Sequence, residues 1–397
     1  GAGNAGLEKR FDKYLRGVDG TSTRQRVAGH WEYIPIVEAE NGADVHTTLD
    51  ANLMDICEST LRKQLQVNQA DWGCVVMMEV KTGKIKAMCN LDRSEEGEYY
   101  EWHNHAVTRM EPGSTFKTLA LMAALDDGRV DFNDSIEVWK DGWKYYGSRH
   151  IDAHPADTIY SIRQALAVSS NIALARIVTD GYEGSAKKFV RKLQKMGVND
   201  TVDYIIPGAD QSKIELPKDT VTISKMAYGY SVELSPLQMA MLYNGIANDG
   251  KLITPVLVDQ VKKDDEVLES YHTKVLRNSM CSNKTLREIQ SCLHDVVWDN
   301  DLGTASVYKW KGHIAKYKAQ SKLVAIAGKT GTAQVFENGR YYSNKHRMSF
   351  VGYFPEEEPQ YTCICVIANP KGGYDSGLDC GIVVRNIAEK AIANQGF

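Results

Sequence analysis

The hydrophobic positions of the chain fall into two patterns, which predict strands towards its two ends and helices between them. Runs in which nearly every residue is apolar predict buried strands, and two of these runs flank the turn Lys81-Thr82-Gly83-Lys84 as in a hairpin. The predicted sheet strands are 73–80, 85–90, 323–329, 348–354 and 361–368. Two further strand-like segments are 44–49 and 252–261.

Apolar residues spaced three and four apart predict amphipathic helices over much of the remaining chain. The expected helices cover 7–15, the segment that starts at 49–52, 162–177, 187–196, 236–248, 286–297 and 382–393. Two strands near the start, three near the end and a helical block over 132–250 indicate an α/β fold. We expect an antiparallel five-stranded sheet covered by helices on both faces, a mainly helical lobe, and a cleft between the two.

Length, composition and charge limit the possible classes of protein. Of the 397 residues, 43% are hydrophobic, which suffices for a large core, and the net charge of −4 argues against nucleic-acid binding. No run of about twenty apolar residues is present, so the sequence predicts no membrane span. Residues 1–45 are too few to bury a core of their own. We interpret them as a linker or the remnant of an upstream domain, and 46–397 as the main domain.

The residue types that bind metals are present but do not form a recognisable site. The eight cysteines lie mostly in apolar runs, at spacings unlike those of zinc sites, and are expected to be buried free thiols. His103-Asn104-His105 places two histidines close together, with no cysteine or acidic residue at ligand spacing. We therefore expect no metal and no cofactor.

The segment Glu111-Pro112-Gly113-Ser114-Thr115-Phe116-Lys117 carries the first chemical signal. The turn signal Pro-Gly, followed by helix-forming residues, places Ser114 at the first turn of a helix and Lys117 on the same face. A neutral lysine can accept the proton of a serine hydroxyl, and burial or the positive end of a helix lowers the lysine pKa. The segment therefore predicts a nucleophile, Ser114, and its general base, Lys117.

This spacing alone is not specific, because Ser185/Lys188 and Ser306/Lys309 repeat it. Lys188 belongs to a strongly basic run that is typical of a solvated helix face, and Ser306 lies in a polar region next to glycines. Ser114 alone follows Pro-Gly and precedes a long apolar run, so we favour it over the other two serines.

Small polar residues, Ser169-Ser170-Asn171, interrupt the apolar pattern of the helix predicted at 162–177. Two interpretations remain open. The serines and the asparagine can cap or bend the helix, since such side chains compete for backbone hydrogen bonds. Alternatively they form a polar patch facing the cleft, in which Ser169 relays a proton and Asn171 hydrogen-bonds a substrate amide.

A third segment, Ala327-Gly328-Lys329-Thr330-Gly331-Thr332-Ala333, is expected to end the strand predicted at 323–329. An extended peptide substrate can pair with such a strand by strand addition. The two glycines allow a ligand to approach the backbone, Lys329 supplies positive potential, and the two threonine hydroxyls suit a carboxylate.

The three segments together resemble a known superfamily. Ser-Thr-Phe-Lys at 114–117, Ser-Ser-Asn at 169–171 and Lys-Thr-Gly-Thr at 329–332 occur in the order found in penicillin-binding proteins and serine β-lactamases. The stretches EPGSTFK, SSNIALARI and AGKTGTAQ resemble class B penicillin-binding proteins, the monofunctional peptidoglycan D,D-transpeptidases. GLEKRFDKYLRGVDG and NGADVHTTLD resemble the segment between the N-terminal pedestal and the catalytic domain of that family. YGYSVELSPLQ is more similar to the septal, cell-division branch than to the elongation branch.

The resemblance implies a penicillin-binding/serine β-lactamase-like fold and a role for each catalytic residue. Ser114 would attack the carbonyl of the penultimate D-alanine of a stem peptide and form an acyl-enzyme, with Lys117 as general base. Ser169 and Lys329 would pass the proton to the departing D-alanine, and an amine of a second stem peptide would then take the acyl group.

The resemblance also implies the substrate-binding residues. Asn171 would hold the amide of the donor peptide, and Thr330, Gly331 and Thr332 would bind its terminal carboxylate. The backbone N–H groups of Ser114 and Thr332 would form the oxyanion hole, in which each donor contributes about 3 kcal/mol. The middle motif Ser-Ser-Asn, in place of the Ser-Asp-Asn of many β-lactamases, favours the transpeptidase.

Partners and location follow from the same resemblance. We expect peptidoglycan stem peptides as substrates, β-lactam antibiotics as inhibitors, and a cell-wall glycosyltransferase and divisome proteins as partners. The expected location is the periplasmic or extracytoplasmic face of the cell membrane, with an anchor upstream of Gly1 in the full-length protein. The alternatives are a serine β-lactamase or D,D-carboxypeptidase, in which water replaces the amine, and a non-catalytic β-lactam-binding sensor or scaffold. The segment 334–345 is a candidate gate for the cleft.

Overall fold

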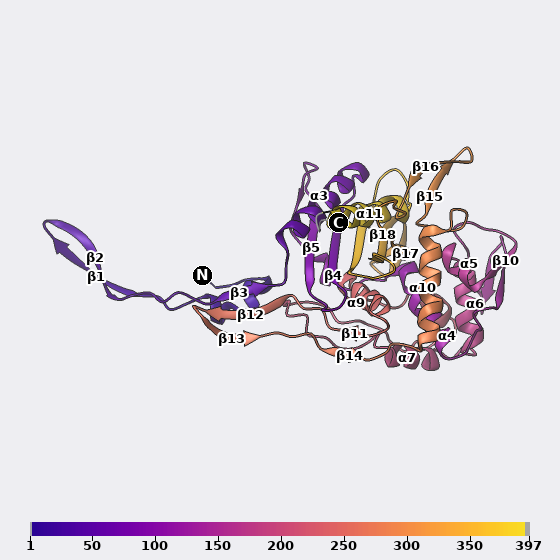
Figure 1. Ribbon diagram of the computed structural model, residues 1–397, viewed down its shortest axis with the longest axis horizontal. Helices are drawn as coiled ribbons and strands as arrows, with labels where there is room; N and C mark the ends of the chain where they lie inside the picture. The colour runs from indigo at the N-terminus through magenta and orange to yellow at the C-terminus, as the bar shows by residue number, and fades with distance from the viewer. Residues whose placement is uncertain (1, 394–397) are drawn as a thin grey trace.

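A six-stranded antiparallel sheet runs through the main body of the protein, in the order β17-β18-β19-β4-β5-β6 (Figure 1). The strands are β4 Trp72–Glu79, β5 Ile85–Arg93, β6 Tyr99–Tyr100, β17 Ala327–Glu337, β18 Arg340–Phe354 and β19 Tyr361–Ala368. The five expected strands are all present, and β6 is an addition that is too short to leave a sequence pattern. The computed structural model describes residues 2–393.

The strand predicted at 323–329 lies further along the chain, and this part of the prediction was wrong. β17 begins at Ala327, so Lys329 and the residues after it lie within the strand and not at its end. From Gly331 onwards buried residues alternate with more exposed ones, as in a strand with one covered face, whereas Leu323 is exposed and lies outside the sheet. The segment 334–345 forms the outer end of the β17–β18 hairpin rather than a separate loop.

Alternating side chains of the sheet enter two separate cores. Val76 on β4 and Ile364 on β19 belong to the core that includes α4 (Lys117–Asp126) and α9 (Pro236–Ala247). Val75 and Cys363, one position away, enter the core that includes α3 (Ala51–Asn68) and α11 (Ile382–Ala393). Helices therefore cover both faces of the sheet, as the hydrophobic pattern predicted.

A mainly helical lobe packs beside the sheet (Figure 1). Its helices are α5 Ile162–Ala167, α6 Asn171–Gly181, α7 Ala186–Lys195, α8 Thr222–Met226 and α10 Asn283–Trp298, with short strands β7 Ser135–Val138, β8 Trp143–Tyr145, β9 Ser148–His150 and β10 Thr158–Ser161. The continuous helix predicted at 162–177 is broken between α5 and α6. Ser169 has a left-handed φ of 58°, and the Ser170 side chain caps α6 by accepting a hydrogen bond from Ala173 N at 3.0 Å.

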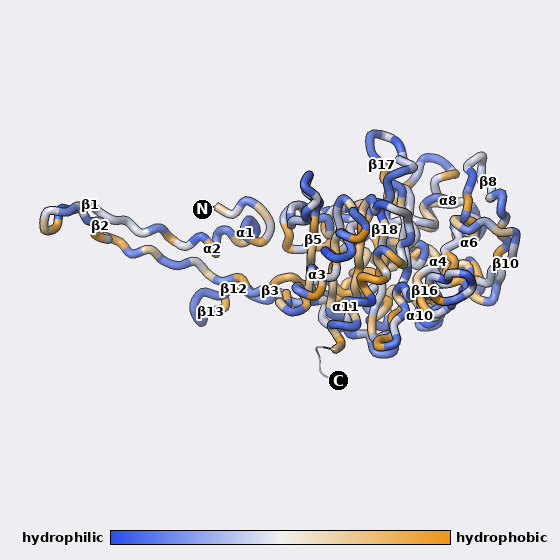
Figure 2. The backbone as a smooth tube through the Cα atoms, turned by 90° about the horizontal axis from the view of Figure 1, so that it is seen from above, coloured by the Kyte–Doolittle hydropathy of each residue, from blue (hydrophilic) through white to orange (hydrophobic). Residues whose placement is uncertain are grey.

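The N-terminal segment contains more helices and strands than the sequence predicted. It contains α1 Gly6–Arg10, α2 Asp12–Leu15, β1 Thr21–Val27, β2 His30–Val37 and β3 Asp44–Thr47. Strands β1 and β2 form a hairpin that extends away from the body in both views (Figures 1 and 2). The sequence analysis treated this hairpin as connecting sequence, because its side chains are almost all exposed and leave no alternation of buried positions.

A second small sheet joins the N-terminal segment to the body. Strand β3 pairs with β12 (Val258–Lys263), which pairs with β13 (Glu266–Ser270). Phe11 is buried against Val258 and Val261. The remaining strands are β11 Leu252–Ile253, β14 Val275–Arg277, β15 Val307–Trp310 and β16 His313–Tyr317, so the strand expected at 252–261 is in fact two.

The eight cysteines are all buried and unbridged, which confirms the prediction of free thiols. Across residues 2–393, no helix combines the length and the apolar character that crossing a membrane requires.

Candidate active site

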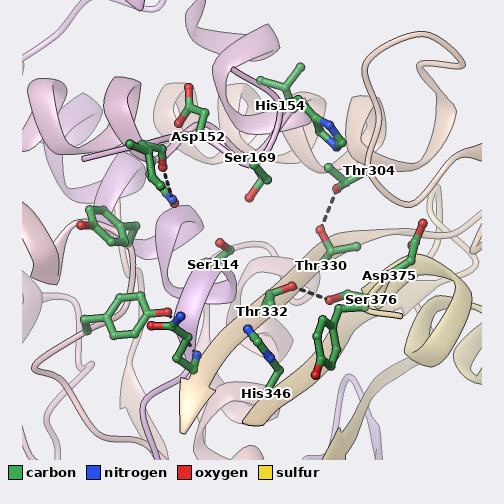
Figure 3. Close-up of a pocket in the computed structure, with 18 of the residues that line it drawn as sticks. Ser114, Asp152, His154, Ser169, Thr304, Thr330, Thr332, His346, Asp375 and Ser376 are labelled. Carbon is green, nitrogen blue, oxygen red and sulfur yellow. Dashed lines mark hydrogen bonds between the residues drawn. The ribbon is translucent and has the colours of Figure 1, made fainter. Parts of the chain in front are cut away.

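A cavity of about 720 Å³ lies between the helical lobe and strand β17. Its walls include the turn before α4, the segment 149–154, the α5–α6 junction, strand β17 and the segment 374–377. Ser114, Ser169, Thr330 and Thr332 lie around this one space (Figure 3). Folding therefore brings the three sequence motifs together, although more than two hundred residues separate the first from the last.

The 3₁₀ helix η2 (Gly113–Phe116) carries Ser114 and continues directly into α4. Gly113 has a φ of 59° and lies so close to strand β17 that a Cβ there would be 2.5 Å from the carbonyl oxygen of Thr332. A side chain at position 113 would therefore collide with the strand. Lys117, the first residue of α4, is fully buried, while Ser114 remains partly accessible to the cavity.

The buried amine of Lys117 is bonded to the middle motif. Its Nζ donates hydrogen bonds to the Ser169 carbonyl oxygen at 2.6 Å and to Ser169 Oγ at 3.0 Å. Within the described residues 2–393, the hydrogen bonds of Lys117 Nζ all go to Ser169, and none goes to the Ser114 hydroxyl. Such bonds are often long in proteins without substrate and form only in the reacting complex.

Lys329 reaches the same serine from strand β17. Its Nζ donates to Ser169 Oγ at 2.9 Å and to the Thr330 carbonyl oxygen at 3.0 Å. The Ser169 hydroxyl is therefore held between two fully buried lysines, one from helix α4 and one from strand β17. A hydroxyl between two amines can pass a proton from one to the other.

Burial changes the acidity of both lysines. It lowers the pKa of Lys117 from 10.5 to about 7, although the nearby Asp152 carboxylate opposes this shift. Burial also lowers the pKa of Lys329 well below its usual value, and the nearby Lys117 adds to the effect. Near pH 7 the Lys117 amine is therefore neutral in a large fraction of the molecules and able to accept a proton.

The two interpretations of the middle motif apply to different residues, although the proton relay itself stays a prediction. Ser170 is the helix cap, and Ser169 is the polar group that faces the two lysines. Asn171 also lines the cavity, and its side-chain Nδ2 donates to the Ile151 carbonyl oxygen at 2.8 Å. That bond fixes the amide and leaves its oxygen as an acceptor for a ligand.

The two threonines of strand β17 are held by residues that the sequence analysis missed. Thr330 Oγ1 lies 2.7 Å from Thr304 Oγ1, and Thr332 Oγ1 lies 2.9 Å from Ser376 Oγ. Gly331 lies between the two threonines, where a Cβ would be 2.3 Å from Ser349 Oγ. Thr304 and Ser376 lie in connecting segments, and neither belongs to a motif that could have identified it.

Asp152 is a further residue that the sequence did not indicate. Its Oδ2 accepts a hydrogen bond from Ser170 Oγ at 2.7 Å, and its Oδ1 accepts one from Ile172 N at 3.0 Å. These two bonds fix the start of α6, and with it the motif that the lysines contact. Asp152 is a positioning residue on the cavity wall (Figure 3).

The two rejected serine–lysine pairs lie outside the cavity. Ser185 caps α7, while Lys188 forms an ion pair with Glu183 at 2.5 Å. Ser306 donates to Asn300 Oδ1 at 2.7 Å, and Lys309 bonds Asp301. Their side chains have structural partners of their own, so the choice of Ser114 from its sequence context agrees with the geometry.

Comparison with known proteins identifies the family of the chain. The family model of the penicillin binding protein transpeptidase domain matches residues 73–389. The probable peptidoglycan D,D-transpeptidase PenA of Neisseria meningitidis is 27% identical over 395 residues, which are 96% of this chain and 63% of PenA. The peptidoglycan D,D-transpeptidase FtsI of Buchnera aphidicola is 24% identical over 382 residues, covering 94% of this chain and 62% of FtsI. The chain thus spans less than two thirds of the length of these relatives.

Solved structures show the same fold. Penicillin binding protein 2X from Streptococcus thermophilus superposes with a TM-score of 0.85 at 22% identity, covering 99% of this chain and 59% of that one. The chain therefore belongs to the penicillin-binding protein transpeptidase family. Within that family, the resemblance to class B penicillin-binding proteins is confirmed by relatives that match nearly the whole chain.

Proposed function

We propose that this chain is a peptidoglycan D,D-transpeptidase that cross-links stem peptides through an acyl-enzyme on Ser114. The observation that carries the proposal is the pair of buried lysines, Lys117 and Lys329, which both donate to Ser169 beside the cavity that Ser114 lines. This arrangement supplies a nucleophile, a base with a pKa of about 7 and a proton relay in one place.

The proposed reaction has two steps. Neutral Lys117 takes the proton of Ser114, whose Oγ bonds the carbonyl carbon of the penultimate D-alanine. The peptide bond then breaks, and the terminal D-alanine leaves with a proton passed from Lys117 through Ser169, where Lys329 donates from the other side. In the second step an amine of another stem peptide attacks the ester, forms the new amide and returns the proton to Ser114.

The substrate would lie along strand β17. Thr330 and Thr332 would donate to the terminal carboxylate, and Gly331 between them lets the strand pack tightly against Ser349 and Thr115 on its inner face. The free amide oxygen of Asn171 would accept a hydrogen bond from the peptide N–H. The backbone N–H groups of Ser114 and Thr332 would stabilise the oxyanion. The close approach of η2 to β17 at Gly113 supports this pairing.

The wider assignments rest on the family. We infer that the domain spans 46–397, that residues 1–45 are the remnant of a pedestal, and that the protein acts outside the cytoplasmic membrane. An anchor upstream, a cell-wall glycosyltransferase partner and a divisome role follow from the resemblance to the septal branch. β-Lactams, which mimic D-alanyl-D-alanine, would acylate Ser114.

Labelling with a fluorescent penicillin, followed by intact-mass and peptide mass spectrometry, tests the proposal. We expect one acyl group on Ser114, no labelling of the Ser114→Ala variant, and unchanged labelling of Ser185→Ala, whose serine has the same spacing to a lysine. A stem-peptide donor with an acceptor amine should then give a cross-linked product. Labelling of Ser114→Ala would contradict the site.

The alternatives give different results in the same assays. Loss of the penicilloyl group within seconds would identify a β-lactamase, and release of D-alanine without cross-linked product would identify a carboxypeptidase. Labelling without any turnover of stem peptides would identify a sensor or scaffold.

The cavity favours the transpeptidase over the β-lactamase, because no glutamate that could activate a water is found among the described residues that line it. Its two carboxylates, Asp152 and Asp375, are bonded to Ser170 and Lys318.

Replacing Asp152 by asparagine should shift the pH dependence of acylation. The Asp152 carboxylate opposes the effect of burial on Lys117, so its removal lowers the pKa of Lys117 further. The rise in acylation rate with pH should then have its midpoint at a lower pH than in the wild type. Stopped-flow acylation from about pH 5 to about pH 9 measures this midpoint. Asp157→Asn, an exposed carboxylate that pairs with Lys140, is the control. An unchanged midpoint in Asp152→Asn would contradict the assignment.

A further inference from the structure

Three side chains of types that bind metals, one aspartate and two histidines, lie close together away from the cavity. Asp92 is near the end of β5, His103 follows β6, and His105 begins the 3₁₀ helix η1 (His105–Val107). One ligand atom from each of the three residues lies within 4.8 Å of the other two. The sequence analysis rejected a metal at these histidines because it found no acidic partner. That premise was wrong, since Asp92 comes from a neighbouring strand eleven residues before His103.

The distances between the three groups suit a shared cation. His105 Nε2 lies 2.8 Å from Asp92 Oδ1, and His103 Nδ1 lies 3.5 Å from the same oxygen. Ligand atoms of a tetrahedral zinc ion at its usual bond lengths are about 3.3 Å apart. Moving His105 by about half an ångström would bring its distance to Asp92 to this spacing, and the distance from His103 is already close to it.

The surrounding residues hold these ligands in place. Asp92 Oδ2 accepts a hydrogen bond from the His103 backbone N–H at 3.0 Å, which leaves Oδ1 facing the histidine rings. Asn90 Oδ1 accepts from Ala106 N at 3.1 Å and fixes the backbone next to His105. The His105 ring stacks on Trp72 with ring centroids 3.9 Å apart and nearly parallel planes. Supporting contacts of this kind orient the ligands of metal sites.

We propose that Asp92, His103 and His105 bind one divalent cation of the zinc type. Two imidazoles and one carboxylate match the ligand preferences of Zn²⁺, whereas Mg²⁺ and Ca²⁺ favour oxygen ligands. Water would complete the coordination, because the His103 side chain is 67% exposed and the site is open to solvent.

The bound cation would have a structural role. None of its three ligands lines the catalytic cavity. The cation would fasten the segment after β6 to strand β5, and the chain runs from η1 directly to η2 and Ser114. It would therefore stabilise the start of the connection that leads to the proposed nucleophile.

Metal binding to the chelator-treated protein tests this proposal. We expect one equivalent of Zn²⁺ to remain after gel filtration in zinc-containing buffer, measured by elemental analysis, and Co²⁺ to give a visible absorption band that Zn²⁺ abolishes. Excess Zn²⁺ should raise the thermal midpoint by about 3 °C. Asp92→Asn and His103→Ala should each weaken binding by at least about tenfold. His272→Ala, an exposed histidine outside the cluster, should bind like the wild type.

The His103→Ala variant is expected to fold normally, because the exposed imidazole ring can be removed without opening a cavity. Penicillin labelling of each variant, measured in parallel, reports whether the active site is intact, so a failure here is separate from a failure of the proposed reaction. The proposal is overturned if the wild type retains no Zn²⁺ and gives no Co²⁺ spectrum. Equal binding by the His103→Ala variant overturns it as well.

Discussion

Replacing Lys117 by methionine should slow the acylation of Ser114 by penicillin about 10²- to 10⁴-fold, the range that general-base catalysis contributes. Methionine fills a similar volume in the buried site but cannot accept a proton. In the wild type the acylation rate should rise with pH through about 7, because protonated Lys117 is inactive below its pKa and neutral Lys117 is active above it. Rapid-mixing kinetics with a chromogenic β-lactam measure both effects.

The control for this variant is Lys188→Met, which has the same spacing to a serine but lies on an exposed helix face. It should acylate like the wild type, with the same pH profile. If Lys117→Met retained full activity, or if the wild-type rate were flat between about pH 5 and about pH 9, another group would have to be the base.

Replacing Gly229 by alanine should lower the free energy of unfolding by about 3 kcal/mol or more and reduce penicillin labelling. Gly229 has a φ of 89°, and a Cβ there would be 2.0 Å from the carbonyl oxygen of Gly113 and 2.7 Å from its nitrogen. These are backbone atoms of the residue next to Ser114, so the clash can be relieved only by pushing apart the segment around Gly229 and the turn that carries Ser114. Urea unfolding and the acylation rate measure the two consequences.

Gly208→Ala separates this clash from simple backbone strain. Gly208 has a similar φ of 80°, but a Cβ there would meet nothing within 4 Å. Its replacement should cost only the left-handed conformation of alanine, about 1–2 kcal/mol, and leave labelling unchanged. Equal losses in the two variants would show that the contact with Gly113 is unimportant.

The sequence predicted the elements whose side chains are buried in a regular pattern. Helix α9, for example, begins with Ser235 followed by Pro236, and a reciprocal capping box with Gln238 marks its start. The strands of the central sheet were found because both of their faces are covered and nearly all of their residues are apolar. The β1–β2 hairpin was missed for the opposite reason, since strands that bury neither face leave no such pattern.

The motifs of the site could be found in the sequence, but their partners could not. Ser114, Ser169 and Lys329 each lie in a short segment with an unusual mixture of polar and small residues. Asp152 and Thr304 act through contacts between segments distant in sequence, and nothing local distinguishes them from other loop residues. The same limitation hid Asp92 from the analysis of the two histidines, because only the pairing of β5 with the following segment brings these side chains together.

The hydroxyl of Ser169, held between Lys117 and Lys329, has a consequence for the electrostatics of the whole cycle. Two ammonium groups this close in a buried site repel each other, so a proton on one amine makes protonation of the other less favourable. In the proposed reaction Lys117 gains the proton of Ser114 and then gives it up to the departing D-alanine, so the positive charge beside Ser169 is largest while the oxyanion is present. The attraction between these amines and the developing anion should therefore be strongest in the acylation step itself.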